Sequence, residues 1–172
     1  MKTEAPISFT SILDDFNSNL WHFHITVPGP VAQAFIDGSD RRVLCTLNDA
    51  ETFQCALMPK GDGAYFININ KKLRDKLKLK KGMQVQVSLV KDTSKYGLPM
   101  PEELEELLAQ DEAGNFLFHA LTPGKQRTLL YIVGSPKTTD TRLQRALTVV
   151  EHLKKNNGKI NFRQLNEDLR AK

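Results

Sequence analysis

The chain of 172 residues has two cysteines, one tryptophan and no long apolar run. No segment reaches the ~20 apolar residues that a membrane-spanning helix needs, and residues 1–9 lack the charged-then-apolar pattern of a signal peptide. We therefore expect a soluble cytoplasmic protein with no membrane insertion. Two cysteines without a Cys or His at metal-ligand spacing predict reduced structural thiols rather than a disulfide or zinc site. We expect no metal and no cofactor.

The composition is that of a folded globular protein, with 40% hydrophobic and 26% charged residues. The net charge of +4 is unevenly distributed. Residues 99–121 contain six acidic residues and no Lys or Arg, whereas residues 122–172 contain 11 basic and four acidic residues. This alternation favours charge pairing within the chain as much as it favours an anionic partner.

Short alternating segments between residues 7 and 92 predict strands, because each is bounded by Gly, Pro, Asn or Asp. The six predicted strands are ISFTSILDDF, LWHFHITVP, RRVLCTLN, TFQCALMPK, AYFININ and MQVQVSLVK. Two short helices are expected among them, at residues 31–38 and, after an Asn70 cap, at residues 71–79. The predicted fold is α+β, with a small six-stranded β-barrel at residues 1–95 followed by a helical domain at residues 99–172.

Four helices are expected in the second domain, beginning near Pro101, Thr122-Pro123, residue 139 and residue 161. The longest, at residues 139–158, carries one apolar stripe made of Leu143, Ala146, Leu147, Val150 and Leu153. We expect this stripe to pack on another element.

Two neighbouring strands contain the cysteines and allow a prediction of register. With a loop at residues 49–51, Val43 would oppose Leu57, Cys45 would oppose Cys55, and Leu47 would oppose Phe53. All these apolar groups would then share one face. The sequence predicts two buried thiols that face each other.

A basic segment, KKLRDKLKLKKG at residues 71–82, carries seven cations in its first eleven residues. Clustered cations are typical of nucleic-acid binding, and equally of the solvated face of a short helix that buries Leu73 and Leu77. The order strand, short helix, Gly turn, strand resembles the barrel element of AbrB-like swapped-hairpin proteins, some of which bind DNA. Fold similarity alone does not transfer that function.

Residues in both parts carry a second resemblance. In the first part they are Trp21, Val27-Pro28, Arg42-Val43, Leu47, Phe53, Pro59, Gly61-Asp62-Gly63, Lys71, Leu73, Arg74, Gly82, Val85, Val87 and Asp92. In the second they are Pro101, Leu104, Phe118, Leu121, Arg127, Tyr131-Ile132, Lys137, Asp140-Thr141-Arg142 and Arg145. Their order resembles the uncharacterised bacterial YdeI or OmpD-associated (bacteriocin-protection) family, with its N-terminal barrel domain of unknown function. The resemblance implies a link to envelope stress or bacteriocin tolerance and no established chemistry.

The histidines and the Gly-Asp-Gly segment are weak candidates for chemistry. His22 and His24 are two apart on one strand, which suits either a metal or acid/base pair or a half-exposed polar side, and no third ligand is evident. His119 and His152 are expected at helix surfaces or caps. The segment 61–63 lacks the spacing of a phosphate loop, so we expect a hairpin turn. We predict no catalytic residues.

The preferred candidate ligand-binding residues are Arg127, Tyr131, Lys137, Thr141, Arg142 and Arg145. Arg forks bind carboxylates or phosphates, while a Thr hydroxyl and a helix start add donors. The same cations could instead form an internal ion-pair network with the acidic helix at residues 101–112. By helical spacing we expect Arg142 to be the least exposed arginine and to meet a carboxylate or a bound anion.

The leading functional hypothesis is a non-enzymatic binding protein that recognises an anionic small molecule or a protein partner. The alternative is a nucleic-acid-binding regulator that uses the AbrB-like barrel. An enzyme is the third hypothesis.

Overall fold

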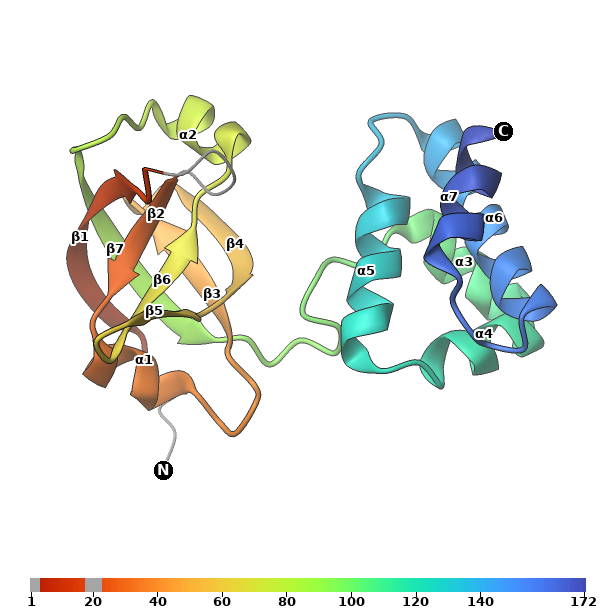
Figure 1. Cartoon of the computed structure of the whole chain (residues 1–172), viewed down its shortest axis with the longest axis horizontal. Coiled ribbons are helices and arrows are strands. Elements are labelled where there is room, and N and C mark those ends of the chain that lie inside the picture. Colours follow the sequence, from red (N-terminus) through yellow and green to blue (C-terminus); the bar gives the residue numbers. More distant parts are fainter. Residues whose placement is uncertain (1–3, 18–22) are drawn as a thin grey trace. The chain divides into compact units, whose positions relative to one another are not determined.

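The computed structural model describes residues 4–17 and 23–172, and the chain divides into two compact units at Thr93. The seven described strands belong to the first unit, whereas the second is helical (Figure 1). Each unit has its own hydrophobic core. Trp21 and His22, which we named from the sequence, lie outside the described residues.

The first unit is an antiparallel sheet that forms a half-barrel. Its strands are β1 (Ile7–Asp15), β2 (Phe23–Val27), β3 (Arg42–Leu47), β4 (Glu51–Ala56), β5 (Met58–Gly61), β6 (Ala64–Asn68) and β7 (Gln84–Lys91). Across the sheet they follow the order β4-β3-β7-β1-β2-β6-β5. The alternating apolar residues of the central strands, among them Leu13, Ile25 and Leu89, are fully buried in its core.

The prediction of a closed six-stranded barrel is wrong, because the segment expected as one strand at residues 52–60 divides at Leu57. Its first half, β4, pairs with β3, whereas its second half, β5, pairs with β6. Leu57 is fully buried between them, and its N–H donates to the Arg41 carbonyl. Among the described strands no ladder joins β4 to β5, so both are sheet edges. Pro59, which has no N–H, suits such an edge.

The predicted register of β3 and β4 is wrong by two residues. Cys45 pairs with Phe53, and Cys55 pairs with Val43. The turn is tighter than expected because Asn48 and Asp49 both have positive φ. A shift of two preserves the inward face, so Cys45 is fully buried and Cys55 is half-buried. A hydrogen bond with Cys55, together with burial, raises the pKa of the Cys45 thiol.

Two helices interrupt the strands, as expected. Helix α1 covers Gly29–Phe35 rather than residues 31–38, and α2 covers Lys71–Leu77. The Asn70 side chain caps α2 by accepting a hydrogen bond from the Leu73 N–H at 2.9 Å. The Gly turn is confirmed at Gly82, whose φ is +88°, but the AbrB-like relationship stays a prediction. The expected hairpin at residues 61–63 is also confirmed, since it joins β5 to β6.

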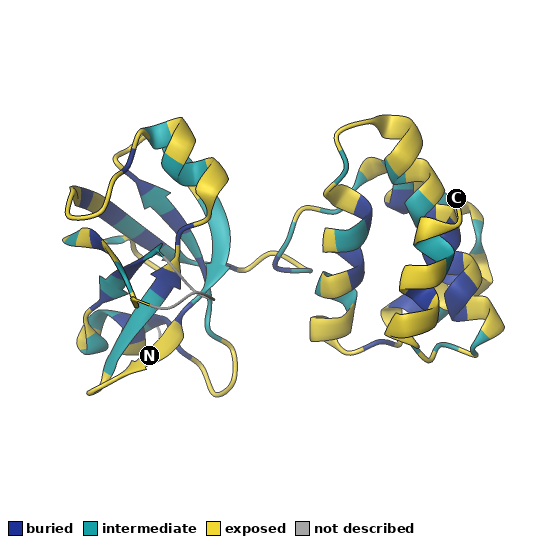
Figure 2. Cartoon of the chain, turned by 45° about the horizontal axis from the view of Figure 1, so that its top comes forward, coloured by how far each residue is buried: buried dark blue, intermediate teal, exposed yellow. Residues whose placement is uncertain are grey.

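The second unit consists of α3 (Glu102–Gln110), α4 (Glu112–His119), α5 (Pro123–Gly134), α6 (Thr139–Lys155) and α7 (Phe162–Arg170). Helix α4 was not predicted separately. Asp111 lies between α3 and α4 and caps α4, because its carboxylate accepts a hydrogen bond from the Gly114 N–H at 2.8 Å. In Figure 2 the buried parts of these ribbons lie on the inner sides of the helices, and α6 contacts α3, α4, α5 and α7. None of the helices within residues 4–17 and 23–172 has the length and apolar character to cross a membrane.

Candidate functional site

The six residues of the predicted basic cluster lie on α5, on α6 and on the link between them. Arg127, Arg142 and Arg145 are half-buried. Tyr131 is 69% exposed, and Lys137 and Thr141 are also exposed. That these residues bind a ligand stays a prediction.

Arg142 meets a carboxylate within its own domain. Its Nε donates to Glu103 Oε1 at 2.9 Å, and its terminal nitrogens donate to the carbonyls of Pro136 and Lys137 and to the Thr139 hydroxyl. The Glu103 side chain is only 11% exposed. A bond from its own backbone N–H and the bond from Arg142 hold the pKa of Glu103 below its usual range. Most of the five guanidinium protons are therefore used inside the chain.

Arg145 has a similar role at the end of α5. One of its terminal nitrogens donates to the Ile132 carbonyl at 2.9 Å and to the Ser135 hydroxyl at 3.3 Å. The two arginines of α6 thus stabilise the end of α5 and the α5–α6 link. The internal network that we considered as an alternative is present around Arg142.

Beside this network, α3 and α6 line a cavity of about 440 Å³, which we call the α3–α6 groove. It is lined by Leu107, Asp111, Leu147, Val150, Glu151, Lys154 and Lys155. A second hollow of about 340 Å³ adjoins Glu103, Arg142 and the segment before α3. Both hollows lie entirely within the second unit.

Two ion pairs connect α3 to α6, one at each hollow. Glu103 pairs with Arg142 near the start of both helices, and Asp111 pairs with Lys154 at 2.8 Å near the end of both. The hydrogen bond from Lys154, followed by that from the Gly114 N–H, lowers the pKa of Asp111. The two pairs therefore help to hold α3 and α6 side by side.

The expected apolar stripe of α6 is only partly buried. Ala146, Val150 and Leu153 lie in the core, but Leu143 is 44% exposed and Leu147 is 42% exposed. These two leucines lie one turn apart on the side of α6 that borders the groove. The expected packing is therefore confirmed for Ala146, Val150 and Leu153 and wrong for Leu143 and Leu147, which nothing in the sequence distinguished from the buried members of the stripe.

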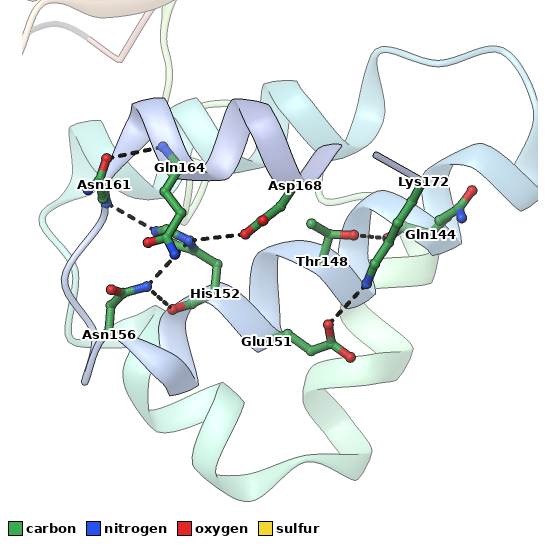
Figure 3. Close-up of polar contacts among 9 residues, drawn as sticks. All are labelled: Gln144, Thr148, Glu151, His152, Asn156, Asn161, Gln164, Asp168 and Lys172. Atoms are coloured by element: carbon green, nitrogen blue, oxygen red, sulfur yellow. Dashed lines mark hydrogen bonds and ion pairs between the residues drawn. The ribbon is translucent and has the colours of Figure 1, made fainter. Parts of the chain in front are cut away.

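His152 is buried between α6 and α7, contrary to our expectation of a surface or cap position. Figure 3 shows its ring among Asn156, Asn161 and Asp168. The Asn161 N–H donates to Nε2 at 3.1 Å, and Asp168 Oδ2 lies 3.9 Å from Nδ1. Because Nε2 is an acceptor, the neutral ring carries its proton on Nδ1. Burial lowers the pKa of His152, and Asp168 partly opposes this effect.

His24 is also buried, so the expected half-exposed position is wrong. Its ring stacks on Phe16 with centroids 3.8 Å apart, and Lys60 Nζ lies 3.0 Å from Nε2. Burial and then the charge of Lys60 lower its pKa. Within residues 4–17 and 23–172, no three His, Cys, Asp or Glu side chains are grouped in a way that would hold a metal ion.

Comparisons with known proteins agree with the resemblance inferred from the sequence. Residues 9–89 match the family model described as Domain of unknown function (DUF1905). Residues 98–156 match the family model described as Bacteriocin-protection, YdeI or OmpD-Associated. Neither a curated protein nor a solved structure matches the chain. The chain therefore joins an N-terminal DUF1905 domain to a C-terminal domain of the bacteriocin-protection, YdeI or OmpD-associated family.

Proposed function

We propose that the protein is a non-enzymatic binding protein whose helical domain holds an apolar segment of a protein partner in the α3–α6 groove. The observation that carries the proposal is the exposure of Leu147, which lines this groove, and of Leu143, which lies one turn before it on the same side of α6. Large apolar side chains exposed together beside a cavity are typical of interaction sites. Family membership supports a role related to bacteriocin protection, and such a role in stress tolerance is part of this proposal.

Of the two ligand classes expected from the sequence, the protein partner has the stronger support. An anionic small molecule would need free guanidinium donors, whereas Arg142 already bonds Glu103 and two backbone carbonyls. The groove instead offers Leu107 and Leu147 along its walls and Val150 at its base. Apolar side chains of a partner helix, spaced at i, i+3, i+4 and i+7, would fit between two helices in this way.

A helical peptide that is neutral and has leucines at these spacings tests the proposal. We expect it to bind the whole chain saturably, as followed by the fluorescence anisotropy of a labelled peptide. Leu147→Gln should weaken binding, because it places an amide against the apolar cavity. The matched control is Phe116→Gln, which changes a side chain that is 72% exposed on α4 and does not line the cavity. Equal binding by the wild type and Leu147→Gln would contradict the proposal.

A further inference from the structure

We infer that the partner segment suited to the α3–α6 groove is a cationic amphipathic helix. The inference rests on the proposed function and adds the charge of the partner. The cavity lining is electrically balanced, because Asp111 and Glu151 accompany Lys154 and Lys155. The charge preference must therefore come from the rims of the groove, where the flanks of a bound helix would lie.

The rim on α3 is acidic. Helical spacing places Glu103, Leu107 and Gln110 on one side of α3, and Glu106 lies one turn before Gln110 on the solvent side. Glu106 is exposed and has no ion-pair partner among the described residues. Residues 99–121 contain no Lys or Arg that could neutralise it locally.

The rim on α6 is acidic as well. Asp140, Gln144, Leu147 and Glu151 follow one another at spacings of four, three and four residues, so they form one stripe. Asp140 is exposed and has no ion-pair partner in the described parts of the chain. Glu151 pairs with Lys172 at 3.1 Å, but both side chains are about half exposed, so this pair is weak.

The lining and the two rims together carry four carboxylates, Glu106, Asp111, Asp140 and Glu151, against two lysines, Lys154 and Lys155. In the Glu103–Arg142 pair and in the Asp111–Lys154 pair, the two charges neutralise each other, so neither pair leaves much charge for a partner. Lys or Arg on the flanks of a bound helix would lie near Glu106 on one side and near Asp140 and Glu151 on the other. Acidic flanks would meet like charges on both sides, which disfavours binding.

Three helical peptides with identical leucine positions and with Gln, Lys or Glu on the flanks separate these possibilities. We expect the Lys peptide to bind about tenfold more tightly than the Gln peptide, because several exposed charge pairs each add a modest gain. The Glu peptide should bind most weakly. Raising the salt concentration should bring the three affinities together, because these rim charges are exposed to solvent. A Glu peptide that binds as tightly as the Lys peptide would overturn the inference.

A triple variant, Glu106→Gln, Asp140→Asn and Glu151→Gln, tests the source of the preference. It should bind the Lys and Gln peptides equally. A control that removes three exposed carboxylates elsewhere, Asp62→Asn, Glu105→Gln and Glu112→Gln, should keep the preference. A preference for Lys that survives in the first variant, or disappears only in the control, would place the effect outside the groove.

Failure of the inference and failure of the proposed function have different signatures. If the Gln peptide binds at the groove but the Lys peptide gains nothing, only the inference is wrong. If none of the peptides binds, the proposed function is wrong. A self-associating chain that becomes monomeric in Leu147→Gln would assign the groove to a second copy and would contradict a cationic partner helix.

Discussion

The Arg142 guanidinium joins α6 to the Glu103 carboxylate of α3 at 2.9 Å while it donates to the carbonyls of the α5–α6 link. One side chain therefore connects three segments of the helical domain. Arg142 is 25% exposed and Glu103 is 11% exposed, so water does not readily replace the lost partner of either group. The pair also lines the smaller hollow before α3.

Arg142→Gln should lower the free energy of unfolding by ~1–3 kcal/mol, because the half-buried Glu103 would lose its charged partner. Urea denaturation of the whole chain measures the loss. Lys137→Gln, which removes an exposed cation of the same predicted cluster, should change stability by less than ~0.5 kcal/mol. Unchanged stability in Arg142→Gln would show that the Glu103 pair is not structural.

Acidification should loosen α7 through His152. A proton on Nε2 would face the Asn161 N–H, so that two donors would oppose each other in place of one hydrogen bond. Since burial lowers the folded-state pKa of His152 below 6.5, its contribution to stability is complete above pH 6.5 and is lost as the pH falls through the folded-state value. A small cavity of about 90 Å³ lies beside His152, and the other charged residues that line it are Glu151, Lys155, Asp168 and Lys172.

Hydrogen exchange of the α7 amides between pH 7.5 and 5 would measure this effect, after correction for the intrinsic pH dependence of exchange. We expect protection to fall in the wild type and to depend much less on pH in His152→Gln. His24→Gln is the control, because His24 is also buried but belongs to the other unit. The same loss of protection in His152→Gln would assign the pH dependence to other groups.

Thiol labelling should separate the two cysteines. Cys45 is fully buried and its pKa is raised, so it should react far more slowly with a thiol reagent than the half-buried Cys55. The single variants Cys45→Ala and Cys55→Ala assign each rate. Fast reaction of Cys45 in the native protein would contradict the packing of the half-barrel core.

The basic run at residues 71–82 should contribute little to folding. Lys76 pairs with Glu51, but the lysine side chain is 59% exposed, and Lys78 and Lys80 form no ion pair within the described residues. Replacing Lys76, Lys78 and Lys80 with Gln should therefore cost less than ~1 kcal/mol. A large fall in melting temperature would contradict this.

The same three lysine substitutions test the nucleic-acid alternative. That alternative would be favoured if the wild type bound random duplex DNA with a steep salt dependence and the variant with Gln at all three positions lost this binding.

Local signals in the sequence predicted much of the architecture. Asn70 and Thr122 are side-chain caps, and they start α2 and α5 where expected. The strand break at Leu57 was not predictable in this way, because an apolar residue within an apolar run carries no turn signal. Helix α4 was missed because it follows α3 with only Asp111 between them, so no loop signal separates the two helices.

The candidate site was less predictable than the fold. The sequence singled out Arg142 and proposed a carboxylate as one of its two partners, but it could not identify Glu103 among six nearby acids. Periodicity placed Leu143 and Leu147 on the apolar side of α6, yet exposure depends on how far α3 lies from α6. That distance is set by tertiary contacts such as the one between Asp111 and Lys154. These two residues are 43 positions apart in the chain, so local sequence patterns do not predict their contact.

The proposed function requires above all that the groove bind apolar side chains. Titrating the neutral leucine peptide into the methyl-labelled whole chain, followed by NMR, would locate binding at residue level. We predict saturable shifts of the methyl signals of Leu107, Leu143, Leu147 and Val150, with those of Leu13 and Leu89 in the half-barrel core unchanged. The absence of saturable shifts at the four groove residues, or equal shifts throughout the protein, would contradict the account.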